Sequence, residues 1–258
     1  MFLYVFSYIM LVPFCFGRAN SSQHNGTKRI LPPQRFRVEV PKNRCGDREI
    51  DDTTRDAYLN QHNEYRSILA RGGGFNGNLL GYAPEAQNMQ KMVYDCSAEK
   101  SALKHAKTCS GELSDKSTRP GFKENIIKLF KNYLNDTDVG KHASFRWWKE
   151  LSLYGVNIEM RFTSEIRYRQ TQIVTHFTKM AWHNNARLGC GHQRCDGFIF
   201  AVCHRCGCGH HRCDGFIFAV CHYGPGGNVI GENIYNPGPT CSNCPGNTTC
   251  DNKTGLCH

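Results

Sequence analysis

The sequence has no long apolar run, no block of like charge and none of the common hydrolase motifs, and each absence removes a class of function. No apolar stretch reaches the roughly 18–20 residues that a membrane-spanning helix needs. The formal net charge is +10, but no basic run of five residues and no basic-aromatic cluster occurs, which disfavours nucleic-acid binding. Neither G-x-S-x-G nor H-E-x-x-H occurs, so the usual serine-hydrolase and zinc-peptidase signatures are missing.

Cysteine is what the sequence has in excess, with 15 in 258 residues. The first residues are almost entirely apolar and are typical of a secretory signal peptide, expected to span residues 1–17. Its removal takes Cys15 and leaves 14 cysteines, an even number that predicts disulfides in an oxidising compartment. We therefore expect a secreted, extracellular protein. Five glycosylation sequons agree with this, at Asn20, Asn25, Asn135, Asn247 and Asn252.

Composition divides the chain into a tail, a main domain and a short end. Residues 18–44 are polar and proline-containing, residues 45–235 form the main domain, and residues 236–258 form a cysteine-rich extension that two disulfides would hold together. Thr53, with Asp56 three residues on, is the expected N-cap of the first helix. Helices followed by strands predict an α+β domain. The pattern predicts helices over 51–71, 97–108, 123–134 and 142–154 and strands over 171–181 and 198–202.

An internal repeat lies late in the main domain. Residues 187–204 read RLGCGHQRCDGFIFAVCH and residues 205–222 read RCGCGHHRCDGFIFAVCH, so 16 of 18 positions agree. It reflects either a tandem duplication of a strand with its turn or a duplication in the gene model. Two copies cannot share one buried position, so one copy is expected at a sheet edge or in a bulge. Deleting residues 205–222 leaves an even 10 of the 14 cysteines, which marks the second copy as the addition.

Two cysteine patterns have spacings known from reactive sites, but disulfides explain both more simply. The run CHRCGCGHHRC at residues 203–213 has zinc-ligand spacing, yet most of it belongs to the repeat, and extracellular thiols usually pair. The C-x-x-C pairs that start at Cys203 and Cys241 do not join a strand to a helix, as a thioredoxin-type site would. The disulfide candidates are Cys45, Cys96, Cys109, Cys190, Cys195, Cys203, Cys221, Cys241, Cys244, Cys250 and Cys257.

Four segments occur in a distinctive order. They are HNEYR at 62–66, KENI at 123–126, THFTKMAWHNN at 175–185 and FAVCHYGPGGNV at 218–229. Together they resemble the signatures of the CAP superfamily of cysteine-rich secretory, antigen 5 and pathogenesis-related proteins. The closing NPGPTCSNCP is most similar to the activation-associated secreted proteins of nematodes, which are SCP-like or venom allergen-like. The resemblance implies a three-layer α-β-α sandwich with a short disulfide-rich extension, and a cleft lined by two histidines and two glutamates.

Carried over residue by residue, the resemblance fills three of the four cleft positions. They are His176 in HFTKMAW, Glu124 in KENI and Glu150 in WWKEL, while the second histidine is replaced by Leu113, just before Ser114. With one imidazole missing, the three groups are expected to form a hydrogen-bonded cluster. They would bind a divalent cation such as zinc only weakly, and no cofactor is required.

Several other prominent side chains are assigned to packing or to the cleft rim. His62 lies on the apolar face of its helix, and His183 and Asn184 are expected at the rim. The tryptophans are expected in the core rather than stacked on a ligand, at Trp147, Trp148 and Trp182.

The resemblance and the incomplete cleft favour a secreted, non-enzymatic CAP-domain protein that acts by binding. The partner would be a host extracellular protein, in keeping with immunomodulation by a parasitic nematode, or a lipid such as a sterol or fatty acid. The alternative is a metal-dependent hydrolase of the peptidase type, in which Glu124 or Glu150 acts as base on a water near His176.

Overall fold

The computed structural model describes residues 43–46, 49–197, 199–204, 207–212 and 215–258. The expected signal peptide, nearly all of the expected tail, Asn20 and Asn25 lie outside the described residues. A four-stranded sheet forms the centre, in the order β3-β5-β8-β4. β4 and β5 pair antiparallel with β8, and β3 runs parallel to β5. These strands span Val93–Tyr94 (β3), Lys123–Leu129 (β4), Arg187–Cys195 (β5) and Phe216–Gly224 (β8).

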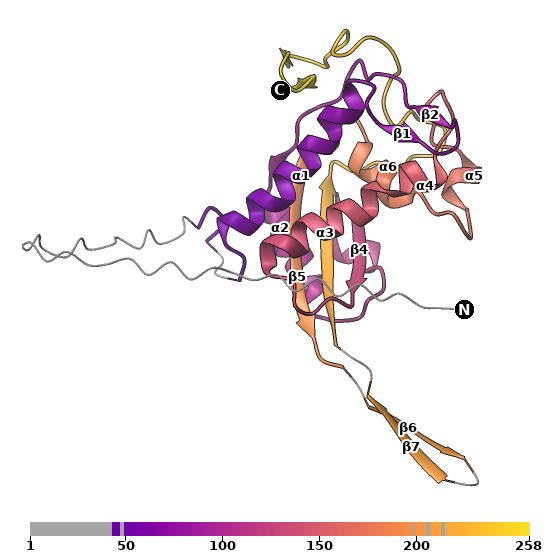
Figure 1. Ribbon diagram of the computed structural model, residues 1–258. Helices are drawn as coiled ribbons and strands as arrows, with labels where there is room; N and C mark the ends of the chain where they lie inside the picture. The colour runs from indigo at the N-terminus through magenta and orange to yellow at the C-terminus, as the bar shows by residue number, and fades with distance from the viewer. Residues whose placement is uncertain (1–42, 47–48, 198, 205–206, 213–214) are drawn as a thin grey trace, which may run out of the picture. The chain divides into compact units, whose positions relative to one another are not determined.

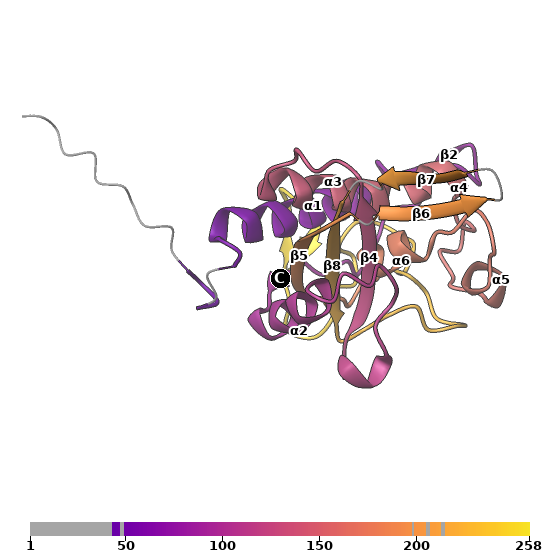
Figure 2. The ribbon, with the colours of Figure 1, turned by 90° about the horizontal axis from the view of Figure 1, so that it is seen from below.

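Helices cover both faces of the sheet and give three layers (Figures 1 and 2). α1 (Asp52–Ala70) and α3 (Asp136–Trp148) lie on one face, and α2 (Cys96–Ala106) lies on the other. The expected three-layer α-β-α sandwich is confirmed. The shorter elements are β1 (Phe75–Asn76), β2 (Gly81–Tyr82), η1 (Lys116–Thr118), α4 (Glu150–Tyr154), α5 (Ser164–Arg167), α6 (Thr175–Ala181), β6 (Ile199–His204), β7 (Gly207–Arg212), β9 (Cys250–Asp251) and β10 (Leu256–Cys257).

Side chains of β8 alternate between two apolar layers, because successive residues of a strand point to opposite faces. Ile217, Ala219 and Tyr223 pack in the cluster that β8 shares with α1 and α3. Phe218 and Val220 pack in the cluster shared with α2. The strand is therefore buried on both sides, which explains its nearly continuous apolar sequence. None of the described helices combines the length and apolarity that a membrane crossing requires.

Two elements predicted from the sequence have the wrong type. The expected helix over 123–134 is a strand from Lys123 to Leu129, because its residues pair along their whole length with β8. The expected strand over 171–181 contains the helix α6 instead. In α6 Phe177 and Ala181 are four residues apart and pack in one apolar cluster. This helical spacing of buried residues favours a helix, although the β-branched and aromatic composition of the segment suggested a strand.

The other helices occur near their expected positions, with different ends. α1 is capped by Asp51, whose carboxylate accepts a hydrogen bond from the backbone N–H of Thr54, and not by Thr53. α3 begins at Asp136, six residues before the expected start at 142, because Asn135 caps it. Lys149 separates α3 from α4, so the predicted single helix over 142–154 is two helices.

The structure splits the two copies of the repeat between the central sheet and a separate ribbon. β5 comes from the first copy and β8 from the second, while β6 and β7 pair with each other in a two-stranded sheet. The ribbon repeats the register of the central pair, since Cys203 lies opposite Cys208 as Cys221 lies opposite Cys190. The expectation that one copy of the apolar strand would be displaced from the buried position is confirmed: Ile199–His204 lies in the ribbon, while Phe216–Gly224 holds the central position in the sheet. Each copy contributes one strand to the sheet and one to the ribbon.

Five disulfides join the described residues. Cys45–Cys96, Cys109–Cys195 and Cys190–Cys221 lie in the main domain. Cys241–Cys250 and Cys244–Cys257 lie in the C-terminal extension, which contains the two disulfides that its composition predicted.

Candidate functional site

Glu124 of β4 is a buried carboxylate surrounded by hydrogen-bond donors. Its Oε2 accepts hydrogen bonds from His105 Nδ1 at 2.7 Å and from His222 Nε2 at 2.8 Å. Ser114 donates its backbone N–H to Oε1 at 2.8 Å and its hydroxyl to Oε2 at 2.9 Å. The Arg119 guanidinium lies 3.6 Å away, and the Glu124 side chain has no exposed surface. These partners come from α2, β8 and the loop after α2, so the tertiary fold assembles the cluster.

The charge of this cluster follows from its hydrogen bonds. Burial raises the pKa of Glu124, but the hydrogen bonds from His222 and Ser114 outweigh it and bring the pKa to about 2. Burial also lowers the pKa of His222, against the attraction of the carboxylate. Near neutral pH Glu124 is thus ionised and His222 neutral. Each histidine donates one ring N–H to the same carboxylate oxygen.

Glu150 and His176 form a second, separate pair. His176 donates Nδ1–H to Glu150 Oε1 at 2.6 Å, and its backbone N–H donates to Oε2 at 3.0 Å. The backbone N–H of Phe177 also donates to Oε2 at 3.0 Å. Glu150, the first residue of α4, therefore satisfies the free N–H groups at the start of α6 while it orients the imidazole. His176 Nε2 has no hydrogen-bond partner among the described residues.

Lys179 lies one turn beyond His176 on α6 and is half-buried. Its ammonium donates to Asn125 Oδ1 at 2.8 Å, and Asn125 Nδ2 donates to the backbone carbonyl of His176 at 3.1 Å. Burial lowers the pKa of Lys179 to about 7, although Glu150 opposes the shift. Asn125 of the KENI segment therefore links β4 to α6 and places an amine beside the Glu150–His176 pair.

The structure brings only two of the three predicted cleft residues into contact. Glu150 binds His176, whereas Glu124 binds His105, His222 and Ser114. Leu113, at the position of the missing histidine, is exposed, while its neighbour Ser114 binds Glu124.

Sequence reasoning missed His105, His222 and Lys179. His105 lies on the face of α2 that carries Ala98, Ala102 and Ala106 and packs on the sheet, so helical spacing in the sequence is the signal that could have indicated its burial. His222 lies directly opposite Glu124 in the β4–β8 register, and only the strand pairing reveals that.

The residues expected to pack do so. His62 is fully buried, with Nδ1 2.8 Å from the Tyr58 carbonyl and Nε2 3.0 Å from the Tyr223 hydroxyl. Trp147 and Trp182 are core residues, and Trp148 is partly buried and stacked on Tyr65.

The expected rim residues His183 and Asn184 follow α6 in the chain. A buried side-chain atom of each, His183 Nδ1 and Asn184 Oδ1, has no hydrogen-bond partner among the described residues.

The donor set does not fit a three-ligand zinc site in the cleft. The lone pairs of Glu124 are taken by its own partners, and the position of the second histidine carries an apolar side chain. Glu150 accepts three hydrogen bonds, so of the three predicted residues only His176 has a ligand atom, Nε2, without a described partner, and zinc sites in proteins usually need three protein ligands. A third group of ligand-type atoms, the sulfurs of Cys241, Cys244 and Cys257, lies within 4.8 Å of one another, but all three are in disulfides and cannot act as thiolates.

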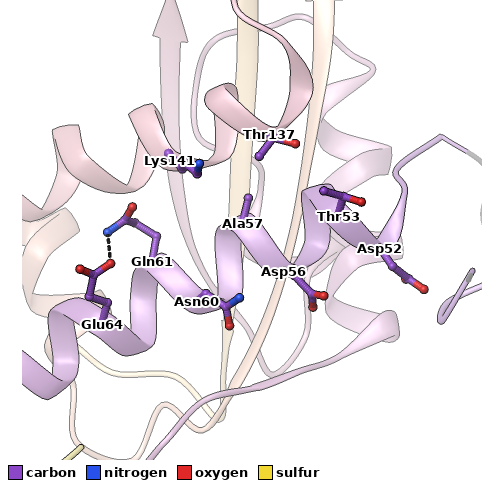
Figure 3. A pocket seen from close by; sticks show the side chains of 9 residues that line it. All are labelled: Asp52, Thr53, Asp56, Ala57, Asn60, Gln61, Glu64, Thr137 and Lys141. Atoms are coloured by element: carbon purple, nitrogen blue, oxygen red, sulfur yellow. Dashed lines mark hydrogen bonds between the residues drawn. The ribbon is translucent and has the colours of Figure 1, made fainter. Parts of the chain in front are cut away.

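A polar groove runs between α1 and α3 (Figure 3). Its cavity measures about 460 Å³, and Ala57 is its only apolar lining residue. Asp52 and Asp56 are already paired with Arg55 and Arg44. The remaining lining residues are Thr53, Asn60, Gln61, Glu64, Thr137 and Lys141. A smaller cavity of about 180 Å³ lies beside His105 and His222.

Three comparisons place the chain among known proteins. The CAP model of the cysteine-rich secretory protein family matches residues 59–205. The "Ancylostoma secreted protein" of Ancylostoma caninum is 39% identical over 208 residues, which cover 81% of this chain and 45% of that protein. The solved structure of Na-ASP-1 has a TM-score of 0.72 and 37% identity, over 84% of this chain and 50% of the other. The structure of NaASP2 with Zn²⁺ has a TM-score of 0.69 and 32% identity, over 83% of this chain and 100% of the other.

The chain spans about half the length of the first two of these proteins. The family match covers most of the main domain, and the relatives share its three-layer fold. The chain belongs to the cysteine-rich secretory protein (CAP) family and is similar, within it, to the ASP proteins of nematodes.

Proposed function

We propose that this protein is secreted and acts outside the cell by binding a host extracellular protein, without catalysing a reaction. The name of its Ancylostoma relative describes a secreted protein, and five disulfides suit an oxidising compartment. Asn135, Asn247 and Asn252 are exposed, so all three remain available as glycan acceptors. Immunomodulation of a host is the role that we propose for the binding.

The observation that carries the non-enzymatic part is the engagement of both carboxylates. A general base near neutral pH needs a pKa close to 7 and access to the proton it removes. Glu124 has a pKa of about 2 and a fully buried side chain. Glu150 accepts three hydrogen bonds from His176 and Phe177, and it orients α6. Both groups are used to hold the fold together, and no feature of the described residues supports the hydrolase alternative.

The described cavities favour a protein partner over a lipid. A sterol or acyl chain requires an enclosed, mainly apolar cavity. The groove between α1 and α3 is open and lined mainly by polar residues, a second hollow of about 320 Å³ beside Tyr65 and Phe145 is also open to solvent, and the cavity beside His105 is only about 180 Å³. Large apolar side chains that could contact a protein partner are exposed on the outer surface and not in a cavity, among them Leu80, Tyr82 and Tyr133.

The test uses the full chain secreted from a eukaryotic host. We expect a mature protein without residues 1–17 in the medium, and saturable binding of the labelled protein to host blood cells that unlabelled protein displaces. Organic extraction and mass analysis should return no stoichiometric lipid. If a stoichiometric sterol or fatty acid is extracted, the ligand is a lipid and not a host protein. Binding that does not saturate would also contradict the proposal.

A metal titration separates binding from hydrolysis. We expect at most weak zinc binding through His176 Nε2, lost in His176→Ala, and no peptidase activity with or without zinc. The control is His142→Ala, which removes a histidine of α3 that has no role in the pairs described above. Peptide hydrolysis that requires zinc and disappears in a folded Glu150→Gln variant would establish the hydrolase instead.

A further inference from the structure

The repeat gives this chain two segments that fit the same position in the sheet. β5, Arg187–Cys195, occupies the position next to β8. Residues 205–213 differ from residues 187–195 at two positions only, Cys206 for Leu188 and His211 for Gln193. The ribbon strand β7 already pairs with β6 in the register that β5 uses with β8. Sequence and register therefore both allow the second segment to replace the first.

The close contacts of β5 with α2 would survive this replacement. A Cβ on Gly189 would lie 2.1 Å from the backbone N of Glu99, and one on Gly191 would lie 2.8 Å from Leu103. Only glycine fits at both positions, and the second segment has glycines there, Gly207 and Gly209.

The disulfide partners would also survive. Cys190 and Cys195 of β5 bond Cys221 and Cys109, and the second segment has Cys208 and Cys213 at the matching positions. Either segment can thus close the same two covalent links.

The two segments are expected to stabilise the sheet to different extents mainly because of one position, Leu188 in the first segment and Cys206 in the second. The side chain of Leu188 is fully buried in the cluster between the sheet and helices α1 and α3, and its carbonyl accepts the backbone N–H of Asp95. Cys206 would place a smaller side chain in that space, with less apolar area removed from water. Gln193, the second difference, is only half-buried, so His211 can replace it at little cost.

We propose that residues 187–195 and 205–213 compete for the β5 position of the sheet, and that Leu188 decides the competition in favour of the first segment. In the described arrangement the segment 196–215 between β5 and β8, which contains the ribbon strands, leaves the sheet after Cys195. In the alternative arrangement residues 187–204 leave it after Ala186 instead.

The exchange changes which end of the sheet carries the extra 18 residues. Arg187 lies opposite Gly224, and Asn125, whose amide reaches the His176 carbonyl, lies opposite Cys221 near the same end. Cys195, opposite Phe216, lies at the other end. The alternative arrangement would therefore attach the extra segment at the end of the sheet nearer to Asn125 and His176.

The disulfides report which segment is in the sheet. The full chain is refolded in a glutathione buffer, so that disulfides exchange, and is then mapped by mass spectrometry without reduction. We expect mainly Cys109–Cys195 and Cys190–Cys221, with a minor population containing Cys109–Cys213 and Cys208–Cys221. The variants are Cys206→Leu alone and the exchange Leu188→Cys with Cys206→Leu.

Each substitution should move the population ratio about tenfold toward the second segment, and the double exchange about a hundredfold. Cys206→Leu leaves the described core unchanged, so it cannot prevent that arrangement from folding. The matched control exchanges Gln193→His and His211→Gln and should leave the ratio as in the wild type. If Cys206→Leu and the double exchange give the control's ratio, the competition does not exist.

Discussion

The Glu124→Gln variant tests the view that the cleft carboxylate stabilises the fold. The substitution keeps the size of the side chain and removes its charge. It leaves His105, His222 and Ser114 donating to an amide, which has one acceptor oxygen in place of two. The loss should appear as a lower free energy of unfolding at neutral pH.

The magnitude follows from the pKa of Glu124. The ordinary pKa is 4.5 and the folded pKa about 2, and this difference corresponds to about 3 kcal/mol of stabilisation of the folded state at pH 7. Because the folded pKa is depressed, this stabilisation is complete above the unfolded pKa and is lost as pH falls toward the folded pKa. It should decline to about 1 kcal/mol at pH 3.

Urea unfolding with the disulfides intact, at pH 7 and pH 3, measures the effect. The control is Glu112→Gln, because the Glu112 side chain is 84% exposed and its nearest cation, on Lys128, is 3.8 Å away. We expect that control to change the free energy by less than about 0.5 kcal/mol. A Glu124→Gln effect below about 1 kcal/mol at pH 7, or one of equal size at both pH values, would refute the reasoning.

Three further predictions concern the scaffold. Glu99→Gln should cost about 3 kcal/mol in urea unfolding, since it removes the two-bond carboxylate partner of the buried Arg55 guanidinium and leaves Asp52 as its carboxylate, and a cost below about 1 kcal/mol would contradict this. Asp51→Ala should cost about 1 kcal/mol by removing the N-cap of α1, whereas Thr53→Ala, at the position that sequence alone suggested, should cost less. Deletion of residues 205–222 should yield a folded protein with five disulfides, in which Cys203 replaces Cys221 as the partner of Cys190. In the full chain, peptide mapping should find Cys203 bonded to Cys208. Scrambled disulfide pairing in either protein would contradict the strand register.

Local sequence was a good guide where one feature dominated. The apolar faces of α1 and α2 gave the positions of both helices, and the cysteine-rich end gave two disulfides. It was a poor guide for β4 and α6, which are short, because the apolar spacing of a short segment fits a strand and a helix about equally well. Pairing with β8 and packing in the core decided these two.

By itself the sequence indicated the family, the three-layer fold and the presence of two disulfides in the C-terminal extension. Each depends on which residues are present and in what order. Only the tertiary structure decided that Glu124 binds His105 and His222 while Glu150 binds His176, and that the repeat divides between the sheet and a ribbon. The reason is physical: a carboxylate binds the donors that strand register and helix packing bring within reach, and which of two nearly identical segments pairs in the sheet depends on the core that surrounds their few differing side chains.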